Sequence, residues 1–219
     1  MIPIVGFVGT SNCGKTTVLC RVVGELAARG YRVATIKHSH ETIEVDHEGK
    51  DTFKHREAGA CQVIAVSAKR LAVMSETEAA QELDELVGRF VDDADIVLVE
   101  GFKHAPVPKI EVWREGQPDE TIVCRDDPHW LALATDYPLD VEVPVLDLNW
   151  PEQIADFIEQ RFLKDVEIAP VRLLVDGKRI ELNAFAAGML AGVVRGALGS
   201  LKGCGDAGRI RLDIDPPQK

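Results

Sequence analysis

The sequence predicts an α/β fold whose core is a doubly wound, mostly parallel β-sheet. Short apolar runs rich in β-branched residues, such as 2–8 and 94–101, alternate along the chain with stretches of helical periodicity, such as 16–30. Apolar runs without polar alternation are typical of strands buried on both faces. Because strands that alternate with helices are typical of parallel sheets, the order of the elements predicts this fold class.

The remaining elements follow at regular intervals. An amphipathic helix is expected over 78–93, and 143–163 is expected to form a strand, a turn and a helix with Pro151 near the helix start. The polar stretch 38–59 has no clean period, so we predict a functional loop there. Further strands are expected at 31–38, 61–68, 70–75, 109–114, 121–125 and 130–136.

A change in pattern after residue 164 predicts two domains, one at 1–164 and one at 165–219. In the second, strand-forming runs flank an Asp-Gly pair at 176–177, which is a strong hairpin signal. A helix rich in small residues and a last strand at 209–215 are expected to follow. The second domain is therefore predicted to be a small ββαβ module, with packing or partner binding as its favoured role.

Charge and cysteine content exclude several classes of protein. The 219 residues include 36 acidic and 25 basic side chains, a formal net charge of -11. This charge repels nucleic-acid phosphates and anionic membranes, so neither is an expected partner. The five cysteines form no CxxC pair, and the N-terminal run lacks the basic flank of a signal peptide. No run approaches the roughly 20 apolar residues of a membrane span, and we expect a cytoplasmic protein.

Residues 9–16, GTSNCGKT, form a complete GxxxxGK(S/T) motif between the first expected strand and the first expected helix. This is the context of a P-loop NTPase domain, in which glycines and helix N–H groups surround phosphate oxygens. Lys15 is expected to reach the β- and γ-phosphates and Thr16 to bind Mg²⁺. Cys13 is expected to fill space in the loop rather than act as a nucleophile. The predicted nucleotide-binding residues here are Gly9, Thr10, Asn12, Cys13, Gly14, Lys15, Thr16 and Thr17.

A second buried strand is expected to supply the acidic residue that a P-loop needs. The run IVLVEG places Glu100 at the carboxyl end of this strand, with Gly101 directly after it. A carboxylate there can orient Mg²⁺ or its water, and a following glycine allows a close approach to the ligand. We therefore predict that Glu100 lies at the metal.

The polar stretch after the second expected strand begins at the same sheet edge as the P-loop. Lys37 and His38 are expected to contact a phosphate or a partner rather than a metal, because the nearby histidines fit no zinc spacing. Asp46 begins a DxxG pattern, which is typical of a loop that senses the γ-phosphate and reaches the Mg²⁺ shell. The segments that contain Lys50, Asp51 and Arg56 gather cations that can hold further phosphates of a second ligand, unless they form a solvated face.

Four motifs together resemble the MobB family of molybdopterin-guanine dinucleotide biosynthesis adaptor proteins. They are VGTSNCGKTT, ATIKHSH, DHEGKDTFKHREAGA and DIVLVEGFKHAPVPKIEVWR, and the resemblance extends over residues 2–163. It implies a homodimeric GTP-binding protein with weak hydrolysis. The implied partners are the molybdenum-cofactor guanylyltransferase and a molybdoenzyme or its chaperone.

The resemblance also implies ligands and site residues. The implied cofactors are GTP and Mg²⁺, with molybdopterin or its guanine dinucleotide as a second ligand. Lys15, Glu100 and Asp46 receive catalytic roles, and Thr16 joins the two carboxylates at the metal. The residues implied to line the site or a pterin groove are Lys37, His38, Asp46, Lys50, Asp51, Arg56 and Lys103.

The sequence departs from a standard GTPase in two respects. It has no (N/T)KxD guanine motif, and the nearest candidate is Asp136, which can accept hydrogen bonds from the guanine edge. No glutamine or arginine is visibly placed to position water or to neutralise the transition state, so hydrolysis is expected to be slow unless a partner supplies such a group. The C-terminal module lies outside the shorter family pattern.

Other functions remain open at this point. A small-molecule kinase would use Asp46 as the base for an acceptor hydroxyl and would show fast phosphoryl transfer. A nickel- or cobalt-insertion GTPase would typically carry a His-rich tract or a close cysteine pair, and the sequence has neither. If the role were purely structural, Lys15→Ala would leave nucleotide affinity unchanged.

Overall fold

A computed structural model describes residues 2–39, 43, 45–77, 79–116, 121–164, 171, 173–175, 178–180, 182–199 and 201. By its internal contacts the chain divides into two compact units, Met1–Arg161 and Phe162–Lys219. This division falls just inside the first predicted domain, and the domain limits at 1–164 and 165–219 stay a prediction.

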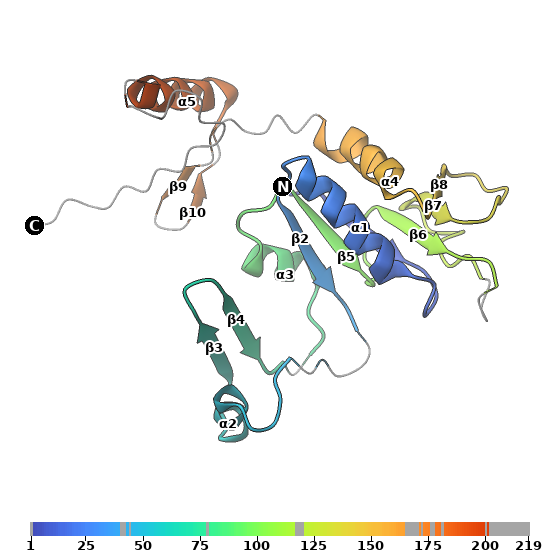
Figure 1. Ribbon diagram of the computed structural model, residues 1–219, viewed down its shortest axis with the longest axis horizontal. Coiled ribbons are helices and arrows are strands. Elements are labelled where there is room, and N and C mark those ends of the chain that lie inside the picture. The colour runs from blue at the N-terminus through green and yellow to red at the C-terminus, as the bar shows by residue number, and fades with distance from the viewer. Residues whose placement is uncertain are drawn as a thin grey trace, which may run out of the picture. The chain divides into compact units, whose positions relative to one another are not determined.

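The first unit is built on a six-stranded sheet in which every pairing is parallel (Figure 1). In spatial order the strands are β2 (Val33–Lys37), β5 (Ile96–Glu100), β1 (Ile4–Val8), β6 (Lys109–Trp113), β7 (Trp130–Thr135) and β8 (Val145–Asp147). The chain winds from β1 toward β2 and β5 on one side and toward β6, β7 and β8 on the other. Such a reversal places a ligand crevice at the carboxyl ends of the strands.

Both faces of the sheet are covered. Side chains alternate along β5, and Val97 and Val99 pack against Leu83 of α3 (Leu83–Phe90). Ile96 and Leu98 project from the opposite face, and all four strand residues have 0% exposure. Helices α1 (Lys15–Ala28) and α4 (Pro151–Ile158) pack against each other, and α1 lies across the sheet (Figure 1). The predicted doubly wound, mostly parallel fold is confirmed.

The polar stretch 38–59, predicted to be a loop, contains helix α2 (Asp51–Glu57). None of the seven residues of α2 is buried, so the helix has no apolar stripe for a periodicity argument to detect. Strands β3 (Gln62–Val66) and β4 (Leu71–Ser75) form a separate antiparallel hairpin, which contacts α2 through β3.

The strand predicted at 121–125 is wrong, because this segment forms turns. The N–H groups of Val123 and Cys124 donate to Oε1 and Oε2 of Glu111, at 2.7 and 3.0 Å. The carboxylate of Glu111 thus accepts the hydrogen bonds that the carbonyl groups of a neighbouring strand would accept in a β-sheet. The helix predicted over 78–93 is shorter than expected, since α3 begins at Leu83 and ends at Phe90.

Strand β6 carries two fully buried charged side chains. Lys109 is 1% exposed, and its Nζ lies 2.8 Å from Asp127 Oδ2 and 2.6 Å from the Ala105 carbonyl oxygen. Glu111 is 0% exposed, and burial raises its pKa above the ordinary value despite the hydrogen bonds from Val123 and Cys124. Burial and the charge of Glu111 also raise the pKa of the Cys124 thiol to about 12. These groups serve the fold, because the chain itself supplies their partners.

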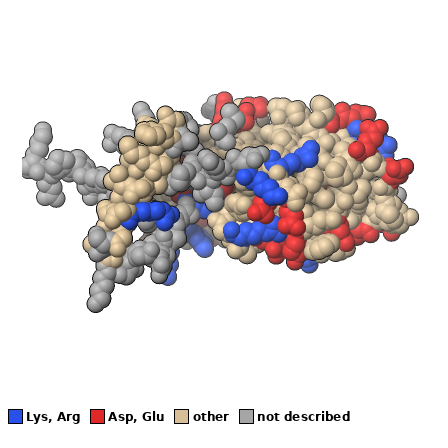
Figure 2. Space-filling model, turned by 90° about the horizontal axis from the view of Figure 1, so that it is seen from above, with Lys and Arg blue, Asp and Glu red and all other residues tan. Residues whose placement is uncertain are grey.

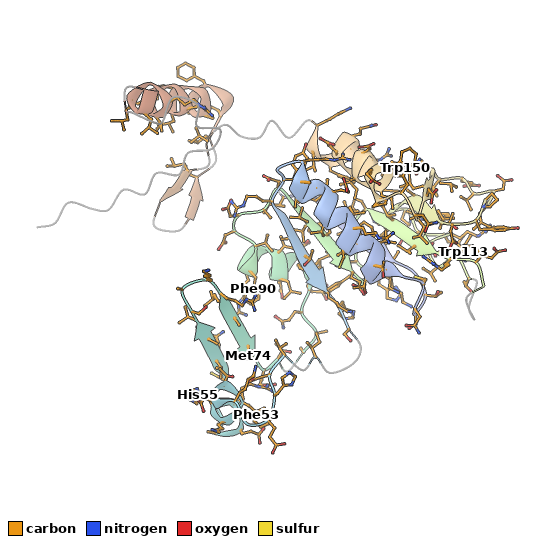
Figure 3. The ribbon with its side chains drawn as sticks, viewed as in Figure 1. Phe53, His55, Met74, Phe90, Trp113 and Trp150 are labelled. Carbon is orange, nitrogen blue, oxygen red and sulfur yellow. The ribbon has the colours of Figure 1, made fainter. Side chains whose placement is uncertain are left out.

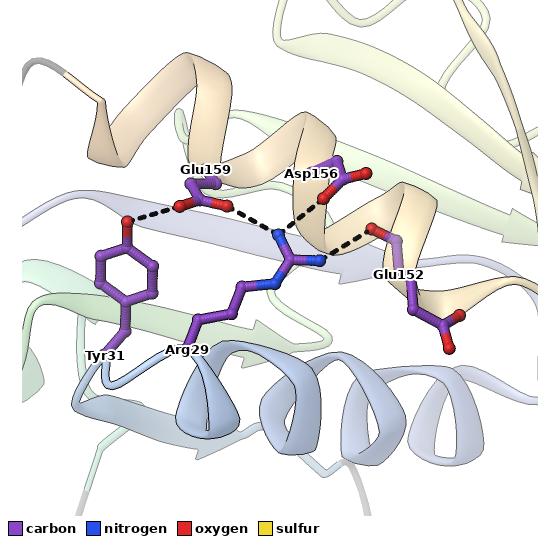
Figure 4. Close-up of polar contacts among 5 residues, drawn as sticks. All are labelled: Arg29, Tyr31, Glu152, Asp156 and Glu159. Carbon is purple, nitrogen blue, oxygen red and sulfur yellow. Dashed lines mark hydrogen bonds and ion pairs between the residues drawn. The ribbon is translucent and has the colours of Figure 1, made fainter.

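The end of α1 is tied to the α4 region by a polar network (Figure 4). Nη1 of Arg29 lies 2.6 Å from Glu159 Oε2 and 2.7 Å from Asp156 Oδ1, and the Tyr31 hydroxyl donates to Glu159 Oε1 at 2.7 Å. Nη2 of Arg29 also donates to the Glu152 carbonyl oxygen at 3.4 Å. Glu159 lies in a π-helical turn, η1 (Glu159–Leu163), which continues α4. The network fixes the end of α1 that is farthest from the P-loop.

The second unit contains an antiparallel pair, β9 (Leu173–Val175) and β10 (Lys178–Ile180), and helix α5 (Ala184–Gly199). The first three elements of the predicted ββαβ order are therefore present. The Asp-Gly pair at 176–177 and the strand predicted at 209–215 lie outside the described residues. Among the described helices, none has the length and apolar character needed to cross a membrane.

Candidate nucleotide-binding site

The P-loop leaves β1 directly against β6. Gly9 has φ +142°, and a Cβ at this position would lie 2.3 Å from the Val112 carbonyl oxygen. Gly14, the residue before α1, has φ +94°, a conformation that side chains other than glycine rarely adopt. Both glycines of the motif are therefore required by the backbone, and the helix N-terminus faces the loop that they shape.

Lys15 lies along the wall of the loop. Its Nζ donates to the carbonyl oxygens of Gly9 at 3.1 Å and Thr10 at 2.5 Å. The first turn of α1 contains no acidic residue, so no side chain of that turn offsets the positive end of the helix. Burial raises the pKa of the Cys13 thiol, against the opposing charge of Lys15, and the thiol is 1% exposed. The loop therefore combines a lysine, a helix N-terminus and a protonated thiol.

The second flank of the site brings together Thr16, Glu100 and Lys37. The strand register pairs Glu100 of β5 with Phe7 of β1 and with Lys37 of β2. The Thr16 hydroxyl donates to Glu100 Oε1 at 2.8 Å, and Lys37 Nζ lies 3.4 Å from the same oxygen. Lys37 is mostly exposed and Glu100 mostly covered. The P-loop threonine and the strand-end carboxylate are thus in direct contact, and their predicted roles at the metal stay predictions.

The oxygens of Thr16 and Glu100 have the chemistry that Mg²⁺ prefers. Mg²⁺ takes oxygen ligands and commonly binds through one or two protein groups, with phosphate and water in the other positions. A hydroxyl and a carboxylate that converge within 2.8 Å beside a P-loop fit this requirement. In the described part of the chain, no three His, Cys, Asp or Glu side chains gather as a metal site of their own.

The segments after β2 and β5 are in close contact. The N–H of His38 donates to the Glu100 carbonyl oxygen at 2.9 Å, and the His38 ring lies 4.6 Å from the Phe102 ring. A Cβ at Gly101, whose φ is +93°, would lie 3.1 Å from the His38 carbonyl oxygen. Lys103 follows in the next turn. His38 and Gly101 therefore hold this sheet edge together.

The remaining predicted residues of the polar stretch lie with α2. Oδ1 of Asp46 accepts from Thr52 Oγ1 at 3.0 Å and from the His47 N–H at 3.1 Å. Asp46 is buried, and its Oδ2 has no hydrogen-bond partner among the described residues. Asp51 pairs with Lys54, and Lys50 is the residue before α2.

Arg56 connects α2 to the segment after β4, because its Nε lies 3.0 Å from Glu76 Oε1. Phe53 and His55 of α2 and Met74 of β4 belong to the same group of elements (Figure 3). The contacts described for Asp46, Asp51 and Arg56 are thus within this group. Their predicted roles at the nucleotide stay predictions.

Sequence reasoning missed Arg114, which directly follows the last residue of β6, Trp113. Trp113 is labelled in Figure 3. Its Nη2 lies 3.8 Å from the position that a Cβ would take on Gly14. Its Nε lies 3.6 Å from Oδ2 of Asp136, whose Oδ1 accepts the N–H of Glu115 at 3.3 Å. The available signal was the position of Arg114 at a strand end, but its nearness to the P-loop depends on β6 being the neighbour of β1.

Acidic and basic side chains are interspersed over the face of the molecule shown in Figure 2. Such mixing is typical of a solvated surface rather than of a binding face for a polyanion.

Comparison with known proteins identifies relatives of this chain. Residues 4–136 match the family of molybdopterin guanine dinucleotide synthesis protein B, MobB. The molybdopterin-guanine dinucleotide biosynthesis adapter protein of Haemophilus influenzae is 46% identical over 159 residues, which cover 72% of this chain and 88% of that protein. The corresponding Escherichia coli adapter protein is 42% identical over 164 residues, covering 72% and 92%. A crystal structure of molybdopterin-guanine biosynthesis protein B superposes with a TM-score of 0.59 at 30% identity, covering 72% of this chain and 98% of that one.

Proposed function

This chain belongs to the MobB family, and we propose that it acts as a GTP-binding adapter in the biosynthesis of molybdopterin guanine dinucleotide. The observation that carries the proposal is the contact between the P-loop and β5. Thr16 of a complete P-loop donates to Glu100 at 2.8 Å, next to Lys15. Triphosphate binding with Mg²⁺ requires this combination of lysine, hydroxyl and carboxylate.

Each residue of the site has a defined task in this proposal. Lys15 and the N–H groups of the loop bind the β- and γ-phosphates. Thr16 and Glu100 would hold Mg²⁺, which neutralises phosphate charge when it is bound. Lys37 pairs with Glu100, and its proposed task is to contact the γ-phosphate from that side of the loop.

Hydrolysis is proposed to be weak. Asp46, the residue assigned to the γ-phosphate, makes its described hydrogen bonds to Thr52 and His47 instead of to the P-loop. Without a group that positions water, P-loop proteins hydrolyse GTP slowly. The role is therefore that of an adapter, with the molybdenum-cofactor guanylyltransferase and a molybdoenzyme or its chaperone as proposed protein partners in the cytoplasm.

A second ligand, molybdopterin or its guanine dinucleotide, is part of the proposal. The dinucleotide form carries phosphates, which basic side chains recognise. The candidate contacts are Lys50, Arg56 and Lys103, as the family resemblance implies.

A homodimer is also proposed, and the β3–β4 hairpin supplies its supporting observation. Ile64 faces Val73 and Val66 faces Leu71 across the hairpin. These side chains are 57%, 41%, 78% and 63% exposed, so one face of the hairpin is apolar and open to solvent. An unpaired apolar face of this kind is a common site of self-association. Sedimentation should show a dimer for the wild type and a monomer for Val66→Asp.

Calorimetric titration tests the proposed function. Purified protein is titrated with GTP, ATP and a non-hydrolysable GTP analogue, each with and without Mg²⁺. We expect guanine-selective, Mg²⁺-dependent binding that Lys15→Ala reduces by 100-fold or more (~3 kcal/mol). Lys69→Ala, which removes an exposed lysine on the hairpin turn, is the matched control and should bind normally. ATP preference would favour a small-molecule kinase, and no binding at all would reject the proposal.

A further inference from the structure

The two flanks of the P-loop carry different chemistry. On the β5 side lie Thr16, Glu100 and Lys37, the groups suited to the metal and the terminal phosphate. On the β6 side lie Arg114 and, beyond it, Asp136 at the end of β7. Because the sheet order is β5, β1, β6 and β7, these two sets of residues stand on opposite sides of the loop.

Strand β6 holds Arg114 close to the loop. The contact of Gly9 with the Val112 carbonyl leaves no space for even a methyl group between the loop and β6. Arg114 follows Val112 by two residues, and its Nη2 lies 3.8 Å from the position of a Gly14 Cβ. Its side chain is 41% exposed, so an anion in the loop can reach the guanidinium.

Asp136 is the ion-pair partner of this guanidinium. Its Oδ2 lies 3.6 Å from Arg114 Nε, and its Oδ1 is fixed by the Glu115 N–H at 3.3 Å. Asp136 is the less exposed partner, at 24%. An ion pair at Nε leaves the end-on N–H groups of the two terminal nitrogens available, and these donors can bind phosphate oxygens as a fork.

We propose that Arg114 is a phosphate-binding residue on the side of the nucleotide's inner phosphates, and that Asp136 is the residue that positions it. This deepens the proposed function and depends on it. A nucleotide whose terminal phosphate faces Glu100 extends its α-phosphate toward β6, where Arg114 lies. Arg114 therefore recognises nucleoside diphosphates and triphosphates alike and does not act on the terminal phosphate. Asp136 acts through Arg114 on all nucleotides, whichever base they carry.

Titration of the full chain with GTP, GDP and ATP in Mg²⁺ tests the inference. Arg114→Ala should lower the affinities for GTP and for GDP by a similar factor, about 10- to 100-fold, as expected for the loss of a charged hydrogen bond. Arg114→Lys should recover part of the loss. The slope of log affinity against log salt should become shallower in Arg114→Ala, because one phosphate–cation contact is removed. Arg21→Ala, which removes an exposed arginine from α1, should change none of these values.

The Asp136→Asn variant distinguishes a role of Asp136 in positioning Arg114 from a role in recognising the guanine base. If Asp136 positions Arg114, the variant should lower the affinities for GTP and for ATP by the same factor. Adding Asp136→Asn to Arg114→Ala should then cause no further loss of affinity. A loss confined to guanine nucleotides would contradict the positioning role and assign Asp136 to the base. An effect of Arg114→Ala on GTP but not on GDP would overturn the placement at the inner phosphates. If the wild type binds GTP and Arg114→Ala binds it equally well, the inference is overturned but the proposed function stands. If the wild type does not bind GTP, both are rejected.

Discussion

Two clusters of charged side chains lie on the same sheet but at opposite ends of its strands. At the amino end of β6, Lys109 is 1% exposed and pairs with Asp127. At the carboxyl end of β5, Glu100 accepts a hydrogen bond from Thr16 and forms an ion pair with the exposed Lys37. In the first cluster, other groups of the protein supply the partners of the charge. The second cluster lies beside the P-loop. A buried charge with complete partners indicates a structural role, and a strand-end charge that solvent reaches indicates a ligand site.

The largest expected effect comes from removing the buried cation. Lys109→Met should lower the free energy of unfolding by about 3 kcal/mol, because it leaves the mostly covered Asp127 carboxylate without its partner. Lys54→Met breaks an exposed pair of the same kind, with Asp51 at 3.1 Å, and should cost less than about 0.5 kcal/mol. Urea unfolding measures both. Equal losses would contradict the distinction between the clusters.

The second effect is a pH dependence that originates in Glu111. Burial raises its pKa in the folded protein, so the folded state binds more protons than the unfolded state above the ordinary value of 4.5. The stability that Glu111 contributes should therefore fall as pH rises from 4.5 through its raised pKa, by about 1.4 kcal/mol for each unit of the shift. The measurement is the difference in unfolding free energy between wild type and Glu111→Gln from pH 4.5 to 7.5. A difference that does not change with pH would contradict this account.

Much of this contrast could be predicted from the sequence. The P-loop and the strand-end position of Glu100 follow from local motifs, and their contact follows from the rule that parallel strands share one carboxyl edge. The position of Arg114 could not be predicted, because it depends on which strand lies beside β1. The turns found in place of the strand expected at 121–125 could not be predicted either, because they depend on the tertiary contacts of Glu111. Helix α2 was missed because it buries no residue.

A smaller effect than that of Lys109→Met is expected at a cluster of intermediate exposure. Arg29→Ala removes ion pairs with Asp156 and Glu159, and Arg29 is 25% exposed. Since these pairs are partly solvated, we expect a loss of about 1 kcal/mol in unfolding free energy. Nucleotide affinity should stay within twofold of wild type, because the network lies at the far end of α1 from the P-loop. A large loss of affinity with little loss of stability would show that the two ends of α1 are coupled.

The most direct test of the central claim is GTP titration of wild type and Glu100→Gln, each with Mg²⁺ and with a chelator. If Glu100 is the metal-side carboxylate, Mg²⁺ should strengthen GTP binding at least tenfold in the wild type, and the variant should lose most of this gain while its affinity in chelator stays close to that of wild type. The same gain from Mg²⁺ in both proteins would contradict the account, because Glu100 would then have no part in the metal site.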